Sequence, residues 1–240
     1  MFTTYLVQPI YNIFVYLIGL MPHGDVGFAI IALTLVVRIV FYPAFTSSIR
    51  TQMGMQAVQG EMDEINTTYK DDAQERGKRT MELFKKHKIR PFSSFLALLI
   101  QLPILFALYA AFFREGLPKI ATNLLYPFVS VPHTVGMDFL GFIQLGIAHN
   151  IPLTVLVAGL QYGVMWFSVA RTKKGASKVS AEKEMAQKTQ QQLMLYFFPV
   201  MMGVISYSLP AAVGLYFATT NLVSLLQELV IREQLKTKGL

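Results

Sequence analysis

The sequence predicts an all-α polytopic membrane protein, with five transmembrane helices around a polar cavity, a cytoplasmic helical hairpin and an N-terminal interfacial helix. Of its 240 residues, 53% are hydrophobic and 15% are charged, whereas a soluble domain carries about 25% charged residues. Apolar runs long enough to cross a bilayer lie at residues 27–46, 94–113, 151–169, 192–209 and 211–230. The basic residues are concentrated in alternate connecting segments, which supports the same class.

Residues 1–21 are expected to form an amphipathic helix on the outer surface of the membrane. The apolar stretch from Tyr5 to Leu20 is about 16 residues long, and Gln8, Pro9 and Asn12 interrupt it. A short and broken apolar pattern is more typical of an interfacial helix than of a span.

Arg38 lies inside the first predicted span, 27–46. A charge at the centre of a transmembrane helix costs about 2.5–3.5 kcal/mol on insertion scales. We therefore expect Arg38 to face protein or water, with Thr34 one turn earlier on the same helix face. The alternative is a snorkelling arginine whose head group reaches the membrane surface, since Pro43 could end the span only five residues later.

The polar segment 47–92 is predicted to form a cytoplasmic hairpin of two antiparallel helices. Apolar residues recur at heptad spacing in its first half, which indicates one packed seam. The second half begins with acidic and ends with basic residues, which suits a helix dipole. The seam consists of Met55, Val58, Met62, Ile65 and Tyr69, facing a weaker stripe of Ala73, Gly77, Thr80 and Phe84. We expect this hairpin to be more mobile than the spans; a solvated charged linker is the alternative.

The later spans carry prolines and polar side chains. Pro103 and Pro199 each remove a backbone donor, and methionines cluster around Pro199. For any single polar residue, a hydrogen bond between helices worth about 0.6 kcal/mol is a sufficient explanation. Together, however, they favour one shared hydrated cavity. Its expected lining is Arg38, Thr34, Gln101, Gln161, Tyr216 and Asn221.

The remaining segments are an outer loop at 114–150, a flexible basic loop at 170–191 and a cytoplasmic tail at 231–240. Eighteen of the 21 Lys and Arg residues lie in segments 47–92, 170–191 and 231–240, and two lie in the outer loop. By the positive-inside rule, the N-terminus is outside and the C-terminus is in the cytoplasm. The basic loop could meet anionic lipid or ribosomal RNA.

Catalysis and metal binding find little support in the sequence. There is no cysteine, and the four histidines are not paired within a span. The acidic residues are almost all outside the spans, so a proton relay lacks its carboxylates. We therefore expect no enzyme activity, no cofactor and no metal site.

Five pieces of the chain, in this order, resemble the YidC/Oxa/Alb family of membrane protein insertases. They are the Arg38 span ending in Tyr42-Pro43, the basic hairpin, Gln101-Leu-Pro-Ile-Leu-Phe-Ala-Leu-Tyr109, Phe198-Pro199-Val-Met, and Gly214-Leu-Tyr-Phe-Ala-Thr-Thr-Asn221. The resemblance covers residues 8–233. The chain departs from the large Gram-negative form, which has an extra span and a periplasmic domain, and from the Gram-positive form, which has a lipid-modified cysteine.

This resemblance implies a hydrophilic groove that is open to the cytoplasm and to lipid, with Arg38 as its positive charge. The second and fourth spans would form a slide for substrate helices, bordered by Leu102, Phe106, Phe198 and Met202. The implied partners are nascent membrane proteins and the translating ribosome, with the Sec translocon and anionic lipids as further candidates and no DNA. The implied location is the bacterial plasma membrane. A small transporter or channel using the same cavity, and a purely structural scaffold, remain alternatives.

Overall fold

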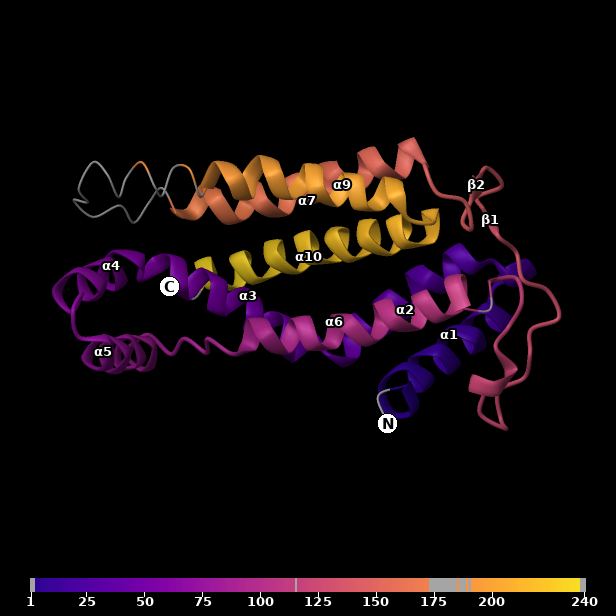
Figure 1. The fold of residues 1–240 in the computed structure, drawn as a ribbon, viewed down its shortest axis with the longest axis horizontal. Coiled ribbons are helices and arrows are strands. Elements are labelled where there is room, and N and C mark those ends of the chain that lie inside the picture. Colours follow the sequence, from indigo (N-terminus) through magenta and orange to yellow (C-terminus); the bar gives the residue numbers. More distant parts are fainter. Residues whose placement is uncertain (1–2, 115, 173–184, 186–188, 190, 238–240) are drawn as a thin grey trace.

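The chain folds into an elongated, mostly helical molecule (Figure 1). A computed structural model describes residues 3–114, 116–172, 185, 189 and 191–237. Its α-helices are α1 (Gln8–Leu20), α2 (Val26–Val40), α3 (Tyr42–Ala57), α4 (Gln59–Thr68), α5 (Ala73–Lys86), α6 (Ser93–Tyr109), α7 (Ile151–Thr172), α9 (Phe198–Ser208) and α10 (Ala211–Thr237). Short π-helical turns occupy Thr3–Val7, Ala110–Arg114 and Leu193–Phe197, and 3₁₀ turns occupy Pro22–Gly24 and Thr122–Leu124. Most of the predicted basic loop, 170–191, lies outside the described residues.

Helix α10 is the central element of the bundle. It packs on one side against α7 and α9, and on the other side against α2 and α3. Figure 1 shows α10 between these two groups, with α6 beside α3. Many side chains on the outside of the bundle are apolar and exposed, including Val155, Val200 and Leu226. Such extensive apolar surface is what a lipid environment accommodates and water does not.

Among the described residues, one continuous helical segment, Ala211–Ile231, is long and apolar enough to cross a membrane by itself. Helices α2 and α3 pass the same test only as a pair, bent by 75° at their junction. Gln8–Leu20, Leu99–Phe113, Ile151–Phe167 and Leu193–Ser208 are shorter apolar helices. By length and hydropathy, the helices of the structure therefore support fewer spans than the five apolar runs of the sequence.

The stretch 27–46 is not one straight helix, as the apolar run suggested. Helix α2 ends at Val40, Phe41 leaves the helical conformation, and α3 begins with Pro43 in its first turn. Proline lacks a backbone donor and its ring clashes with the carbonyl four residues earlier. Pro43 therefore starts a new helix instead of continuing the old one.

Helix α1 is anchored to the outer loop by two buried polar side chains. The Asn12 amide donates to the Leu124 carbonyl (2.8 Å) and accepts from the Tyr126 amide (2.7 Å). The Tyr11 hydroxyl accepts from the backbone amide of Ala121 (2.9 Å). Asn12, which interrupts the apolar pattern in the sequence, is thus a buried contact to the loop.

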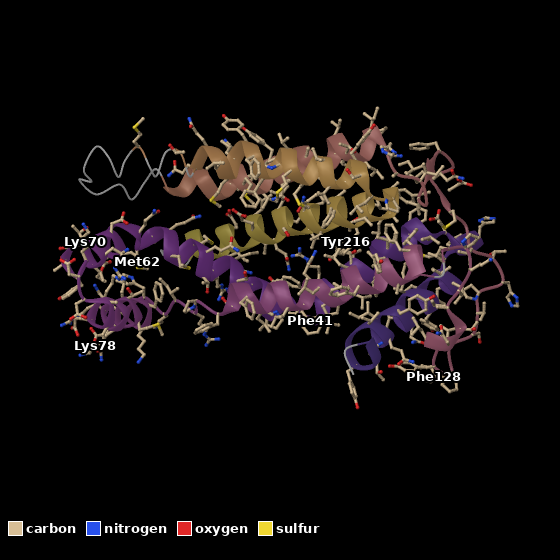
Figure 2. The ribbon with its side chains drawn as sticks, viewed as in Figure 1. Phe41, Met62, Lys70, Lys78, Phe128 and Tyr216 are labelled. Atoms are coloured by element: carbon tan, nitrogen blue, oxygen red, sulfur yellow. The ribbon has the colours of Figure 1, made fainter. Side chains whose placement is uncertain are left out.

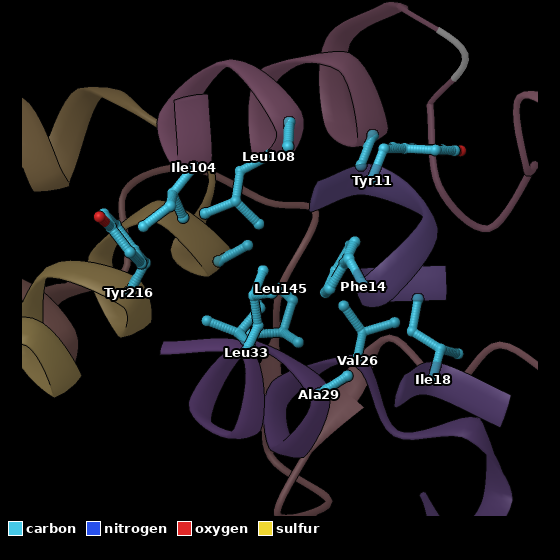
Figure 3. Close-up of a cluster of buried hydrophobic side chains, with 14 of the residues drawn as sticks. Tyr11, Phe14, Ile18, Val26, Ala29, Leu33, Ile104, Leu108, Leu145 and Tyr216 are labelled. Carbon is cyan, nitrogen blue, oxygen red and sulfur yellow. The ribbon is translucent and has the colours of Figure 1, made fainter. Parts of the chain in front are cut away.

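The main apolar core joins α1, α2, α6, the outer loop and the start of α10. Figure 3 shows Phe14, Leu33, Leu108 and Leu145 converging from these elements. The loop also caps α10, because Ala211 and Ala212 donate their backbone amides to the Ile147 and Leu145 carbonyls. It contains an antiparallel pair of two-residue strands, β1 (Asp138–Phe139) and β2 (Ile143–Gln144), which the all-α prediction did not include.

Helices α4 and α5 pack against each other as a separate hairpin beyond α3 (Figure 1). Their small core contains Val58, Met62, Ile65, Leu83, Phe84 and Ile89. Leu83 and Ile89 were not in the predicted stripe, and a methyl group on Gly77 would touch nothing. Lys70 and Lys78 lie on the outside of this hairpin (Figure 2).

Candidate functional site

The Arg38 guanidinium lies inside the bundle and is bound by α10. Its Nη1 donates to Oε1 of Gln227 (2.8 Å), and its Nη2 donates to Oγ of Ser224 (2.7 Å) and to the Thr220 carbonyl (3.1 Å). Arg38 is 7% exposed, so its head group is held within the protein. A snorkelling side chain would extend along the protein toward the membrane surface, whereas this head group is enclosed by α10 and α3.

The helical repeat of α10 brings the three acceptors of Arg38 together. Thr220, Ser224 and Gln227 follow one another at helical spacings of four and three, so they occupy one face of α10. The Ser224 hydroxyl also donates to the Thr220 carbonyl (2.8 Å), which orients its lone pairs toward Arg38. From α3, the Phe45 ring stacks on the guanidinium, with its centroid 4.2 Å from Cζ. Contacts from α10 and α3 therefore fix the position of a cation carried by α2.

All three hydrogen-bond acceptors of Arg38 are neutral. Among the described residues, the ion pairs that form lie in the α4–α5 hairpin, and none involves Arg38. The positive charge is thus hydrogen-bonded but not neutralised by a carboxylate in contact with it. Burial of a charge is expensive, and a second buried charged side chain, Glu228, lies one helical turn after Ser224 on α10.

The other predicted groove residues make none of the hydrogen bonds to this cation. Thr34, Gln161, Tyr216 and Asn221 are buried and Gln101 is half-buried. The Thr34 hydroxyl donates to the Ile30 carbonyl of its own helix (2.8 Å). The Tyr216 hydroxyl lies close to the side chains of Thr220 and Gln101, and it is near enough to Arg38 to feel its charge. Figure 2 shows Tyr216 on the central helix of the bundle.

Several buried polar atoms on α9 and α10 make no well-formed hydrogen bond within the described part of the protein. They include Tyr216 Oη, Thr220 Oγ1, Asn221 Nδ2 and Ser206 Oγ. Leaving such a group unsatisfied costs about 1–3 kcal/mol. The interior of the bundle around α10 therefore contains more polar capacity than the protein itself satisfies.

The sequence reasoning missed the residues that hold Arg38. Gln227, Ser224, Thr220 and Phe45 make its direct contacts, whereas Asn221 and Gln161 do not. The signal was present, since positions 216, 220, 224 and 227 form a polar stripe at helical spacing. Nothing in the sequence, however, says that this stripe faces Arg38.

The predicted slide residues lie on the outside of the bundle. Leu102, Phe106 and Phe198 are exposed, and Met202 is half-buried. Helix α6 packs against α3 and α1, while α9 packs against α7 and α10. The two slide helices therefore belong to opposite sides of the bundle.

A separate cavity of about 960 Å³ lies along α3, from Tyr42 to Val58. It is bounded by α3, by the segment connecting α5 to α6, and by Gln234 near the end of α10. We call it the α3 cavity. Within the described part of the chain, no group of three or more His, Cys, Asp or Glu side chains could hold a metal ion.

Comparison with known proteins identifies the family. Residues 18–238 match the family model described as 60Kd inner membrane protein. The chain is 32% identical over 98% of its length to a membrane protein insertase YidC of Oceanobacillus iheyensis, of which it covers 85%. It is 28% identical over 88% of its length to one of Fusobacterium nucleatum, of which it covers 88%. It also matches a longer YidC of Francisella philomiragia at 30% identity, covering 32% of that protein. Nearly the whole chain is thus accounted for by these matches, and it belongs to the YidC/Oxa family of membrane protein insertases.

Proposed function

We propose that this protein inserts nascent transmembrane segments into the bilayer by way of a hydrated groove around Arg38. The observation that carries the proposal is the Arg38 guanidinium, which is buried between α2 and α10 and held only by neutral acceptors. Family membership supports the insertase activity. No enzymatic chemistry is needed, because insertion breaks no covalent bond.

The membrane arrangement we propose has five spans. They are α2 with the start of α3, α6, α7, α9 with the turn before it, and α10. The lysine and arginine bias gives an outer N-terminus, a cytoplasmic α4–α5 hairpin and a cytoplasmic C-terminus. In this arrangement α1 and the loop bonded to Asn12 cover the outer end, and the hairpin extends from the cytoplasmic end. We expect the hairpin to be more mobile than the spans.

The groove is proposed to be hydrated. The unpartnered polar atoms of Tyr216, Thr220 and Asn221 favour water around α10, since a buried water makes about three hydrogen bonds to such groups. Thr34, Gln101 and Gln161 would complete the lining. A polar segment of a client that enters this groove keeps hydrogen-bonding partners, which lowers the cost of leaving water.

The charge of Arg38 would select the polar segment. Acidic outer segments of clients would be attracted to the Arg38 cation, since opposite charges attract more strongly where protein replaces part of the surrounding water. Membrane potential acting on the acidic residues would add to the driving force.

The hydrophobic helix of the client would leave along α6 and α9. Leu102, Phe106, Phe198 and Met202 would border this path. Transfer of apolar surface from water is favourable by about 25 cal/mol per Å², so the client helix supplies the drive and no nucleotide is required. The partners in this scheme are the nascent chain and its ribosome, with the Sec translocon and anionic lipid as additional ones.

Photo-crosslinking tests the scheme. A photoreactive amino acid at Leu102, Phe106, Phe198 or Met202 should capture the transmembrane segment of a stalled, ribosome-bound nascent chain. The control carries it at Val155 on α7, which is also apolar and is more exposed than the four test positions. Equal capture from α7 would contradict a defined slide, and ion conduction by the purified protein without client would favour a channel instead.

A further inference from the structure

The α3 cavity combines apolar, hydroxyl and basic side chains along the length of α3. Tyr42 and Pro43 line it at the start of the helix, Thr46, Ser47, Arg50 and Thr51 in the middle, and Met53, Gly54, Ala57 and Val58 toward the end. The segment that follows α5 adds the basic residues His87, Lys88 and Arg90. Within the spans no such basic cluster occurs. No carboxylate lines the cavity.

Three of these cations are free to bind an anion. Arg50, Lys88 and Arg90 are exposed, and none of them forms an ion pair with another described residue. The fourth, His87, is engaged by Glu61, whose Oε1 lies 3.0 Å from Nε2. In addition, the Thr46 hydroxyl lines the cavity and has no hydrogen-bond partner among the described residues.

The backbone holds two of the cations in place. The Thr51 hydroxyl donates to the Arg90 carbonyl (3.1 Å) and accepts from the Ser93 hydroxyl (2.8 Å), which ties the start of α6 to α3. Lys88 has a φ of +53°. It follows α5 in a Schellman motif, in which the Ile89 amide donates to the Phe84 carbonyl (2.8 Å) and Ile89 packs into the hairpin core. Backbone contacts therefore fix the lining on the α3 side and on the side of the segment that follows α5.

The level of the cavity in the molecule is that of a membrane surface. Gln234, which lines it, lies one helical turn beyond Ile231, where the apolar part of α10 ends. Ile39, three residues before Tyr42, is 73% exposed, and Phe92, two residues after Arg90, is 75% exposed, so exposed apolar side chains adjoin both parts of the lining in the sequence. Tyrosine at such a boundary is typical of the aromatic belt.

We propose that the α3 cavity binds one anionic phospholipid, with its phosphate at Arg50, Lys88 and Arg90 and its glycerol and upper acyl chains along Thr46, Pro43 and Tyr42. The proposal rests on the membrane orientation given under Proposed function. A water-exposed peptide would match the cations, but it would leave Tyr42 and the apolar flank without a partner. A bound lipid at this position would connect α3, the hairpin and α10, and so would brace the hairpin against the bundle.

The test uses the whole protein in nanodiscs of phosphatidylcholine with or without phosphatidylglycerol, in the absence of ribosomes and clients. A photoreactive amino acid at Met53, which lines the cavity, should form adducts with phosphatidylglycerol; at Met55, which is exposed but does not line it, it should not. Native mass spectrometry should show about a fivefold loss of retained phosphatidylglycerol for each of Arg50→Gln, Lys88→Gly and Arg90→Gln. Lys88→Gly suits the positive φ, so the fold at that position is kept, and Lys78→Gln is the matched control away from the cavity.

Equal retention of the two lipids, or unchanged retention in the three variants, would overturn the proposal. Capture of a nascent chain at Met53 in place of lipid, when ribosome complexes are added, would assign the cavity to the client instead. Because lipid retention is measured without a client, its failure leaves the insertase function intact. Loss of insertion activity, conversely, leaves the lipid measurement unaffected.

Discussion

The Nη1 atom of Arg38 donates a 2.8 Å hydrogen bond to Oε1 of Gln227, which joins α2 to a residue 189 positions later in α10. The bond connects the first apolar helix after α1 to the last helix of the bundle. Because Gln227 is neutral, it orients the guanidinium without cancelling its charge. The first two predictions separate these two effects.

Substitutions of Arg38 should affect clients according to their charge. We expect Arg38→Ala to impair insertion of clients with acidic outer segments more than neutral ones, and Arg38→Glu to be worst because it repels them. Arg38→Lys should retain much of the activity, although an ammonium cannot reproduce the forked contacts to Gln227 and Ser224. The measurement is an insertion assay on paired clients that differ only in outer-segment charge, with protease resistance as the check on folding. An equal effect of Arg38→Ala on both clients would contradict a role for the charge.

Gln227 allows the charge of Arg38 to be cancelled while Arg38 itself is kept. Gln227→Glu places a carboxylate at hydrogen-bonding distance from the guanidinium, and we expect a folded protein with selectively reduced insertion of acidic clients. Gln227→Met has a similar size and removes the acceptor but keeps the positive charge. It should lower the free energy of unfolding by about 1–3 kcal/mol while preserving client selectivity. The same client selectivity in the two variants would show that orientation, not charge, matters.

Asn12 should control the attachment of α1 to the outer loop. Asn12→Leu leaves the Leu124 carbonyl and the Tyr126 amide without their side-chain partner, which we expect to destabilise the fold by about 1–3 kcal/mol. Asn12→Asp keeps the acceptor for Tyr126 but places a carboxylate oxygen against the Leu124 carbonyl. Hydrogen exchange of residues 121–126 should rise in both variants. Ile13→Ala, at the exposed neighbouring position, is the control and should leave this exchange unchanged.

The α4–α5 hairpin should loosen in acid. Lys86 donates to the Glu61 carboxylate at 3.0 Å, and His87 lies at the same distance. The hydrogen bond from Lys86, with a smaller contribution from His87, lowers the pKa of Glu61 below its ordinary value of 4.5. A lowered carboxyl pKa contributes stability at neutral pH that is lost as the pH falls through the lowered value. The contribution is small, because Glu61 is exposed to solvent.

Hydrogen exchange of residues 59–86 measures this effect. At neutral pH, Glu61→Gln should exchange faster than the parent protein, and the difference should disappear in strong acid, where Glu61 is protonated. Glu64→Gln, on the same helix and also exposed, is the matched control. A difference that persists in acid would mean that packing, and not the charge of Glu61, joins the two helices.

Sequence alone determined the features that depend on local composition. The apolar runs near 94–113, 151–169, 192–209 and 211–230 each correspond to helical segments in the structure, because hydrophobicity and helix propensity act over neighbouring residues. Three of the five predicted seam residues, Val58, Met62 and Ile65, lie in the hairpin core for the same reason, whereas Met55 and Tyr69 do not. The family was also recognisable, because five motifs in order are a property of the chain itself.

Tertiary structure decided which polar groups meet. Sequence marked Arg38 as costly, but only packing of α10 against α2 brought Thr220, Ser224 and Gln227 to it, at separations of up to 189 residues. The bond of Asn12 to the outer loop and the basic lining of the α3 cavity arise in the same way. Helical periodicity specifies the face on which a residue lies, but the element opposite that face depends on long-range packing. The physical reason is that a buried polar group is stabilised by whichever partner the fold brings within hydrogen-bonding distance, and no local pattern encodes that partner.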